Sequence, residues 1–557
     1  MTSSTPWLSL YPDYLPTEAP AFEQNSLPEL WDENVRQFAH LTAVENMGKK
    51  LTFLELDTLS NCFAAFLQNE CGLKPGDRFA IQLPNTLQFP VAILAALKAG
   101  LILVNTNPLY TSREMEYQFK DSGATAVLIL ANFAHNLEKI IDKTSIKTVI
   151  VTELGDLLGG AKKLLVNFVV KRVKKLVPPF SIRGYVTFAD AVAKGKKAAL
   201  VRPKILRQDL AFLQYTGGTT GISKGAQLSH ENILSNVYQT KLLLENSSRG
   251  KMQEGDVAVI PLPLYHIYAL TATFIYLNQG MTCRMITNPK DLNAFIKALK
   301  KPFHTMIGVN TLFNALLNHP SFHEINLSVV KGFTAGGMAL QETVFKRWKE
   351  KTGTTVAEGY GLSETSPVLT FQIAGRERMG YIGIPIPGTD IRIMDDDGNE
   401  LPHGTSGELC ARGPQVFSGY WQKDNSNVFH EGGWFKTGDI AVMEEDGYIK
   451  IVDRKKDMII VSGFKVFPNE VEGVIASHPK VLEVAAIGVN DDRCGEVVKV
   501  YVVKRDSSLT EEELQIFCKE NLTQYKQPKF IEFKTDLPKT NVGKILRRSL
   551  REEVVTS

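Results

Sequence analysis

The chain has 557 residues, of which 44% are hydrophobic and 22% are charged, a composition typical of a globular protein. This length predicts two or more domains, because one hydrophobic core rarely organises so many residues. The formal net charge is only +3, which does not indicate a nucleic-acid-binding protein.

Six cysteines are spread along the chain, and no two of them form a Cys-x-x-Cys pair. They are Cys62, Cys71, Cys283, Cys410, Cys494 and Cys518. This spacing argues against a disulfide framework and against a zinc site, and it suits a reducing compartment. The N-terminus shows no basic start followed by an apolar stretch, so we expect no secretory signal and a cytoplasmic location.

The first part of the chain alternates between helical and extended patterns. Apolar residues at helical spacing predict helices at residues 30–38, 53–66, 89–97 and 111–119. Short apolar runs predict strands at residues 79–83, 101–104, 127–130 and 148–151. Gly100 could end the third helix, and Thr111 with Glu114 forms the pattern of a capping box. This alternation predicts an α/β fold of parallel strands with helices on both faces, a doubly wound sheet.

Residues 161–179 combine basic and apolar side chains. The cations are Lys162, Lys163, Lys171, Arg172, Lys174 and Lys175, and the apolar residues between them are Leu164, Leu165, Phe168, Val169, Val173 and Leu176. A basic amphipathic helix can lie on an anionic membrane surface, with about 1 kcal/mol from each well-placed cation. The alternative is a solvated helix whose apolar stripe packs on the protein core, and the pattern alone leaves both open.

Residues 215–226 form the motif around which the later motifs group. They hold four glycines, three threonines, Ser223 and Lys224, and they follow an apolar run at residues 210–213 that predicts the end of a buried strand. Glycines let backbone N–H groups approach a ligand, and N–H groups, hydroxyls and lysine bind phosphate. With Ser229 as a helix cap, we expect strand, phosphate loop and helix in that order. The Lys-Gly order excludes a Walker loop, and the alternative is a flexible solvated turn.

Residues 257–283 contain no Asp, Glu, Lys or Arg, and this length could span a bilayer. Pro261, Pro263 and His266 interrupt the stretch. We therefore expect a strand at residues 257–260, a loop, and a buried helix at about residues 269–277 in place of a membrane span. A lone histidine in such a run is more often a satisfied core residue than a ligand-binding one.

Later motifs place glycines and charges after apolar runs, at residues 333–337, 356–365, 433–457 and 538–548. Ligands bind parallel sheets at the carboxyl ends of their strands. Together with residues 215–226, these motifs resemble the adenylate-forming enzymes, which include acyl-CoA synthetases, firefly luciferase and peptide-synthetase adenylation domains. Within this family the chain resembles the bacterial long-chain fatty-acid–CoA ligases over nearly its whole length. Ser223 stands where many members have proline, which loosens the turn without removing a phosphate ligand.

The resemblance implies an enzyme that activates a fatty acid with ATP, releasing pyrophosphate, and then transfers the acyl group from acyl-AMP to CoA. It implies Mg²⁺ as cofactor and a homodimer. It also implies a large domain at residues 1–455, made of doubly wound sheets and a small β subdomain at residues 407–421. A small mobile α+β domain follows at residues 456–557, with Lys456 as the hinge. A lipid substrate favours peripheral attachment of residues 161–179 to the inner face of the membrane.

Residue roles also follow from the resemblance. The ATP-binding residues are Tyr215, Thr216, Gly217, Gly218, Thr219, Thr220, Gly221, Lys224, Gly336, Gly337, Glu358, Gly359, Tyr360, Gly361, Ser363, Thr365, Asp439 and Arg454. The catalytic residues are His266, Glu364, which also binds the metal, and Lys544. The CoA-binding residues are Ser462, Gly463 and Phe464. Without the resemblance, Glu364 would be a solvated loop residue, Asp439 a turn residue and Lys544 part of a solvated tail.

Three alternatives stay open. One is a P-loop phosphotransferase, which the Lys-Gly order disfavours. Another is a non-catalytic lipid-surface protein with a relic nucleotide fold, which the presence of Glu364 and Lys544 disfavours. The third is a ligase for aromatic or medium-chain acids, because the walls of the acyl pocket cannot be assembled from one sequence. Residues 309–312 are our prediction for part of that pocket.

Overall fold

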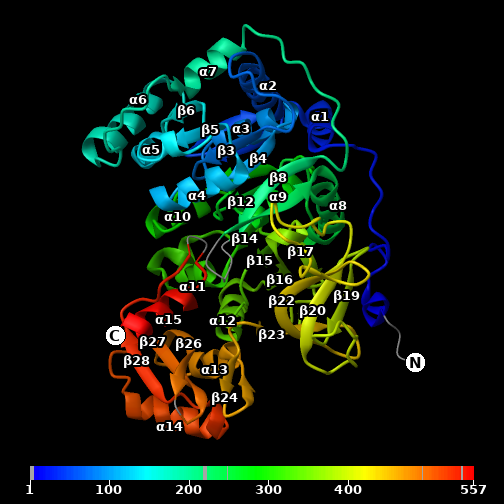
Figure 1. Cartoon of the computed structure of the whole chain (residues 1–557), viewed down its shortest axis with the longest axis vertical. Helices are drawn as coiled ribbons and strands as arrows, with labels where there is room; N and C mark the ends of the chain where they lie inside the picture. The colour runs from blue at the N-terminus through cyan, green and yellow to red at the C-terminus, as the bar shows by residue number, and fades with distance from the viewer. Residues whose placement is uncertain (1–4, 217–222, 248, 492, 541–542, 557) are drawn as a thin grey trace.

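The computed structural model describes residues 5–216, 223–247, 249–491, 493–540 and 543–556. It shows a large α/β domain that carries a β subdomain, followed by a small C-terminal α+β domain (Figure 1). The predicted fold class is confirmed. The two sheets of the large domain and the sheet of the β subdomain together position the site described below.

One sheet of the large domain has seven strands in the order β7-β6-β5-β3-β4-β8-β9. They are β3 (Arg78–Gln82), β4 (Ile102–Asn105), β5 (Ala126–Leu130), β6 (Thr148–Thr152), β7 (Val186–Thr187), β8 (Leu210–Thr216) and β9 (Lys224–Ser229). All neighbours pair in parallel except β8 and β9. The accompanying helices are α2 (Phe53–Asn69), α3 (Gln88–Lys98), α4 (Ser112–Ser122), α5 (Ala134–Glu138) and α7 (Phe188–Gly195). Strands covered on both faces need continuous apolar runs, and β5 is buried throughout.

The other sheet has nine strands in the order β18-β17-β16-β15-β14-β12-β13-β1-β2. They are β1 (Thr42–Asn46), β2 (Lys49–Thr52), β12 (Val257–Ile260), β13 (Thr282–Met285), β14 (Thr305–Gly308), β15 (Gly332–Ala335), β16 (Val356–Gly361), β17 (Val368–Phe371) and β18 (Ile384–Pro385). Its helices are α1 (Leu27–Phe38), α8 (His230–Glu245), α9 (Ile267–Leu277), α10 (Leu292–Leu299), α11 (Asn310–Asn318) and α12 (Glu342–Thr352). Helix α9 is apolar on nearly every face and almost fully buried, as a core helix must be.

The remaining strands form a β subdomain and the sheet of the small domain. The subdomain contains β19 (Asp390–Met394), β20 (Gly407–Arg412), β21 (Phe429–His430), β22 (Trp434–Met443) and β23 (Ile449–Arg454). The small domain contains β24 (Ile459–Val461), β25 (Phe464–Val466), α13 (Pro468–Ala476), β26 (Val481–Asp491), β27 (Gly495–Lys504), α14 (Glu511–Asn521), β28 (Phe530–Lys534) and α15 (Arg547–Thr556). A short hairpin, β10 (Asn246–Ser247) with β11 (Gly250–Lys251), follows α8.

Most predicted elements are present within a few residues of their expected ends. The capping box of α4 is formed, because Thr111 Oγ1 accepts from the N–H of Glu114 and the Glu114 carboxylate accepts from the N–H of Thr111. Gly100 follows α3 with a φ of +72°, which favours glycine. Helix α9 starts before residue 269 because the His266 side chain caps it. Among the described residues, no helix is long and apolar enough to cross a membrane.

The predicted order of strand, phosphate loop and helix is wrong in one respect. The segment Lys224–Ser229 forms β9, which pairs antiparallel with β8, so a strand separates the loop from helix α8. Ser229 does cap α8, through a capping box with Asn232. Residues 224–229 form a strand because Ala226 and Leu228 alternate with polar residues and are fully buried. The predicted phosphate ligands Gly217, Gly218, Thr219, Thr220 and Gly221 lie outside the described residues.

The basic stretch at residues 161–179 lies on the outside of the molecule. It forms α6 (Gly160–Phe168), which continues into a π-helical turn, η4 (Val169–Val173). Neither element has a buried residue, and Leu164 is 71% exposed while Phe168 is 59% exposed. Only Val166 of α6 packs on the core. The alternative in which the apolar stripe of this helix packs on the core is therefore wrong for most of its residues.

Candidate active site

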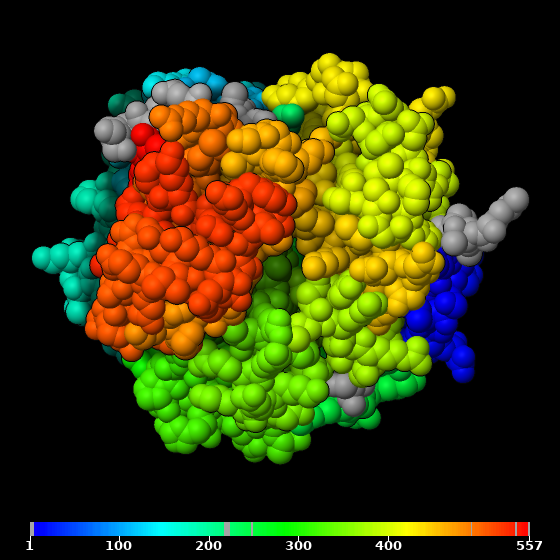
Figure 2. Space-filling view, turned by 90° about the horizontal axis from the view of Figure 1, so that it is seen from below, coloured from blue at the N-terminus to red at the C-terminus, as the bar shows by residue number. Residues whose placement is uncertain are grey.

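A cavity of about 580 Å³ opens where the nine-stranded sheet, the β subdomain and the small domain meet. The carboxyl ends of β14, β15 and β16 form one wall, and helices α8 and α9 form another. Residues of β22, the segment after β23 and Lys544 complete it. The surface is recessed between the small domain, coloured orange to red, and the yellow β subdomain (Figure 2). Parallel sheets bind ligands at this end of their strands.

Most of the predicted site residues line this one cavity. They are Thr216, Lys224, His266, Gly336, Gly337, Gly359, Tyr360, Gly361, Ser363, Glu364, Arg454, Lys456 and Lys544. Tyr215, Glu358, Thr365 and Asp439 do not line it. The folded chain thus brings together motifs that are separated by more than half of the sequence.

Asp439, Tyr360 and Arg454 form a hydrogen-bonded group at the cavity wall. The Tyr360 hydroxyl donates to Asp439 Oδ2 at 2.6 Å, and Arg454 Nε lies 2.7 Å from Asp439 Oδ1. The antiparallel register of β22 and β23 places Asp439 directly opposite Arg454. Burial, and then the Asp439 carboxylate, raise the pKa of Tyr360, so this hydroxyl stays a donor. Asp439 does not line the cavity itself but contacts two residues that do, Tyr360 and Arg454.

Glu364 presents a buried carboxylate at the cavity. It lies in a 3-10 turn, Ser363–Thr365, and its Oε1 accepts from the Tyr420 hydroxyl at 2.7 Å. Burial raises the pKa of Glu364, although the Tyr420 hydrogen bond opposes this shift. Lys224 Nζ lies 5.0 Å from the centre of the Tyr420 ring. Sequence reasoning missed Tyr420, because it assigned residues 419–421 a structural role only.

The donor set is compatible with Mg²⁺. This ion usually takes one or two carboxylates and completes its shell with water and substrate phosphates. Glu364 supplies one carboxylate beside Lys224, which is the predicted phosphate ligand. Within the described part of the chain, no group of three His, Cys, Asp or Glu residues could hold a metal without a substrate.

Lys544 and His266 lie together at the cavity. Desolvation by the surrounding protein atoms, and then the positive charge of Arg454, lower the pKa of Lys544 to about 8, although part of the residue stays exposed to solvent. Burial, and then the charge of Lys544, lower the pKa of His266 to about 4, so the imidazole is neutral at pH 7. A turn holds the lysine, since the Thr540 N–H donates to the Lys544 carbonyl at 2.7 Å and the Lys544 N–H donates to Thr540 Oγ1 at 3.0 Å.

One part of the cavity is apolar. Its walls come mainly from α8, α9, β14, β17 and the segments next to them, with Leu244, Leu262, Ile267, Ala272, Ile275, Ile307, Val309, Met338, Val368 and Phe371. Of the predicted pocket segment 309–312, only Val309 lines the cavity. Helices α8 and α9 were not predicted as pocket walls, because their apolar residues look like ordinary core positions in the sequence.

Three of the predicted ATP-binding residues do not line the cavity, and their side chains bind neighbouring residues instead. The Tyr215 hydroxyl donates to Asp121 Oδ2 at 2.7 Å. Glu358 accepts from the Leu340 N–H at 3.3 Å, and burial raises its pKa to about 8. The Thr365 hydroxyl donates to backbone carbonyls of its own turn. Their side chains are thus used to shape the strands and turns that carry the lining residues.

The predicted CoA-binding residues lie away from the cavity. Ser462 and Gly463 form the turn between β24 and β25. Phe464 is 56% exposed and stacks on Tyr525, with ring centres 4.8 Å apart. In this structure Lys544 faces the cavity and the 462–464 turn does not.

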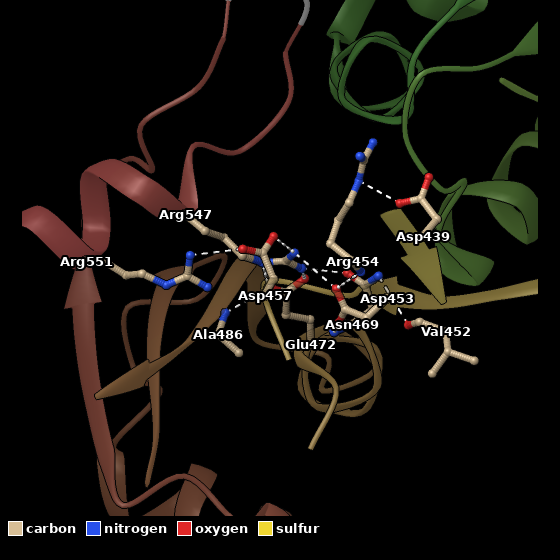
Figure 3. A network of polar contacts seen from close by, with 10 residues as sticks. All are labelled: Asp439, Val452, Asp453, Arg454, Asp457, Asn469, Glu472, Ala486, Arg547 and Arg551. Atoms are coloured by element: carbon tan, nitrogen blue, oxygen red, sulfur yellow. Dashed lines mark hydrogen bonds and ion pairs between the residues drawn. The ribbon is translucent and has the colours of Figure 1, made fainter. Parts of the chain in front are cut away.

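A charged cluster joins the segment after β23 to the small domain (Figure 3). Arg547 Nη2 lies 2.8 Å from Glu472 Oε2, and its Nη1 lies 3.5 Å from carboxylate oxygens of both Asp453 and Asp457. Arg551 Nη1 lies 2.9 Å from Asp457 Oδ1. The cluster surrounds the predicted hinge and ties it to α13 and α15 of the small domain.

The chain matches the model of the AMP-binding enzyme family over residues 31–421 and that of the AMP-binding enzyme C-terminal domain over residues 470–544. It is 49% identical to the long-chain-fatty-acid–CoA ligase of Escherichia coli O6:H1 over 98% of each chain, and 38% identical to that of Bacillus subtilis strain 168 over 99% of each. Among solved structures, ATP-bound MatB from Rhodopseudomonas palustris is 28% identical with a TM-score of 0.80, covering 95% of this chain and 99% of that one. This chain is a member of the AMP-binding enzyme family.

Proposed function

We propose that the chain is an ATP-dependent long-chain fatty-acid–CoA ligase that serves fatty acid degradation and lipid metabolism. It would form acyl-AMP and pyrophosphate from a fatty acid and ATP, and then transfer the acyl group to CoA. The observation that carries this proposal is a single cavity that is lined both by many apolar residues and by Lys224, Glu364 and Lys544. The 49% identity with the Escherichia coli ligase supports the choice of long-chain acids.

The first half-reaction joins two anions, so charge and position decide its rate. An oxygen of the fatty-acid carboxylate attacks the α-phosphorus of ATP, and the bond to pyrophosphate breaks. Holding the two reactants in line can lower the barrier by roughly 7–11 kcal/mol. We assign Lys544 to the carboxylate and α-phosphate, and Lys224 to the outer phosphates. Neutral His266 beside Lys544 can position the carboxylate without competing for it as a second cation.

The nucleotide would lie across the carboxyl ends of the strands. Tyr360 stacks near adenine in this assignment, and Asp439 with Arg454 fixes the ribose. Glu364 would hold Mg²⁺ together with phosphate oxygens and water. When bound, the ion would neutralise charge on the leaving pyrophosphate.

The second half-reaction needs another arrangement of the small domain. We propose that residues 456–557 rotate about Lys456 against residues 1–455, so that Ser462, Gly463 and Phe464 replace Lys544 and line the path of the CoA thiol. The position of that turn outside the cavity supports this. Lys456→Pro should then slow thioester formation from supplied acyl-AMP more than it slows pyrophosphate release. Equal loss in both assays would contradict a hinge at this residue.

The experiment that tests the function is pyrophosphate release from ATP and Mg²⁺ with a series of carboxylic acids, with and without CoA. Release should peak with long-chain fatty acids, and AMP with acyl-CoA should accumulate only when CoA is present. A maximum with aromatic or medium-chain acids would keep the mechanism and overturn the substrate. ADP as the product would support a phosphotransferase, and no product with any acid would support a non-catalytic protein.

We also propose that α6 and η4 attach the protein to the inner face of an anionic membrane from the cytoplasm. The apolar side chains that face solvent include Leu164, Leu165, Phe168, Val173 and Leu176, which are 52–71% exposed. Exposed cations such as Arg172 and Lys174 lie among them. Apolar side chains ringed by cations match lipid tails beneath anionic headgroups.

Vesicle flotation tests this attachment. The wild-type chain should float with vesicles of equal parts phosphatidylglycerol and phosphatidylcholine, and less so with phosphatidylcholine alone. Arg172→Gln with Lys174→Gln should weaken binding about 30-fold, at about 1 kcal/mol per cation. Ile516→Gln is the control, because Ile516 is 57% exposed on α14 of the small domain. Equal flotation of all variants would overturn the proposal.

The resemblance also leads us to propose a homodimer. Light scattering of the purified chain at micromolar concentration tests this. A mass of one chain would contradict it.

A further inference from the structure

Tyr420 lies where the β subdomain meets β9, the strand that follows the predicted phosphate loop. Its neighbours add a short strand to the edge of β9. The Gln227 N–H donates to the Gly419 carbonyl at 3.0 Å, and the Trp421 N–H donates to the Gly225 carbonyl at 2.8 Å. Tyr420 itself forms a bridge with Ala226. The backbone of Tyr420 is therefore fixed to the strand that begins with Lys224.

The side chain of Tyr420 contacts two charged groups of the cavity. Its hydroxyl donates to Glu364 Oε1 at 2.7 Å, and its ring lies 5.0 Å from Lys224 Nζ. The Phe417 ring packs against the same ring in an edge-to-face arrangement, with centres 5.0 Å apart and planes at 77°. The Phe417 N–H donates to the Glu364 carbonyl at 2.8 Å. One segment of the β subdomain thus holds both the side chain and the backbone of Glu364.

We propose that Tyr420 is a positioning residue that sets Glu364 and Lys224 relative to each other for binding the triphosphate. The inference rests on the proposed function. A donated hydrogen bond fixes one carboxylate oxygen and leaves the other free to face the ligand. The aromatic face attracts the ammonium group without neutralising it, so Lys224 stays available to phosphate. Glu364 lies in the 3-10 turn after β16 and Lys224 begins β9, and Tyr420 contacts both of them.

Nucleotide binding without turnover tests this role. The probes are AMP and α,β-methylene-ATP, whose α–β bridge the enzyme cannot cleave, and calorimetry in the presence of Mg²⁺ gives both affinities. Tyr420→Phe removes the hydroxyl and should weaken binding of α,β-methylene-ATP about tenfold, as expected for a lost hydrogen bond to a charged group. Tyr420→Leu also removes the ring and should cost a further factor of about three to ten. Affinity for AMP should stay within twofold in both variants, because Tyr360, Asp439 and Arg454 are unchanged.

The chain offers a matched control for the loss of a tyrosine–glutamate hydrogen bond. The Tyr381 hydroxyl donates to Glu444 Oε1 at 2.9 Å, and neither residue lines the cavity. Tyr381→Phe should leave both affinities unchanged. If Tyr420→Phe weakens the affinities for AMP and for α,β-methylene-ATP equally, Tyr420 is merely structural and the inference is overturned. Unchanged affinities for both nucleotides would overturn it as well. If the wild-type chain binds neither AMP nor α,β-methylene-ATP, the proposed function itself is wrong.

Discussion

At the scale of single residues, the unusual feature is Lys544, because its pKa of about 8 lies close to neutral pH. Lys544 lines the cavity together with Arg454 and His266, and its pKa falls to about 8 from an ordinary value of 10.5. A lysine with a lowered pKa is charged below that value and neutral above it. If Lys544 has to be a cation for adenylation, the free enzyme loses its competent form as the pH rises through 8.

The first prediction follows from this titration. For pyrophosphate release, kcat/KM for ATP should fall about tenfold for each pH unit above 8, because this ratio reports ionisations of the free enzyme. Lys544→Arg stays charged to far higher pH, so its residual activity should lack this alkaline limb. Initial rates between pH 6 and 10 measure both profiles. An unchanged limb in the arginine variant would assign the titration to another group.

The sequence motifs predicted several residues of this site, but they did not predict which other residues these would contact. Lys224, Glu364 and Lys544 were predicted because the motifs that contain them resemble those of the adenylate-forming enzymes. The Tyr420–Glu364 hydrogen bond joins residues from different motifs, and nothing in the local pattern distinguishes that tyrosine from a core aromatic. The same holds for Arg547, whose three carboxylate partners come from two other segments, residues 453–457 and helix α13.

At the scale of elements, the sequence predicted several strands and helices of the two large sheets from their apolar runs and helical spacing, but it did not predict others, such as β1 and β14. It missed β9, since a strand beginning Lys-Gly-Ala carries little apolar signal until the pairing with β8 is known. It also left α6 undecided. Whether an amphipathic helix faces the core or the solvent depends on the surface that the rest of the chain offers, and this surface is not encoded locally.

Three helices are joined by one buried ion pair. The Lys98 side chain of α3 is fully buried, and its Nζ lies 2.5 Å from Asp57 Oδ1 and 2.6 Å from Ser60 Oγ, both on α2. The Trp31 indole of α1 donates to the same Asp57 oxygen at 3.0 Å. Burial lowers the pKa of Lys98 to about 8, while Asp57 opposes this shift. In the sequence, this lysine looks like the solvated end of a helix.

The second prediction concerns that pair. Lys98→Ala should lower the free energy of unfolding by about 3–5 kcal/mol, because it leaves the Asp57 carboxylate without its cation in a low-dielectric site. Lys98→Met combined with Asp57→Leu removes both charges and should recover most of the loss. Urea denaturation of the three proteins measures this. If the double variant is less stable than Lys98→Ala, the pair does not behave as a coupled buried charge.

At the scale of the whole molecule, the sequence predicted two domains but not how they lie against each other. The contact that matters is between the turn carrying Lys544 and helix α11 of the large domain. Gly543 has a φ of +80°, and a Cβ added there would collide with Thr311 Oγ1 and touch Val309. Thr311 was predicted as part of the acyl pocket, but it does not line the cavity and lies against Gly543, next to Lys544.

The last prediction uses this close approach, which the proposed rotation of the small domain would break. Thr311→Met would push the 543–544 turn away, and a displacement of about 1 Å can cost on the order of 100-fold in rate. Pyrophosphate release should therefore fall about 10- to 100-fold. Thioester formation from supplied acyl-AMP should stay near the wild-type rate, because a rotated small domain no longer touches Thr311. Thr311→Ser adds no bulk and should leave both rates unchanged. If Thr311→Met slows both half-reactions equally, the domain arrangement seen here is not specific to adenylation.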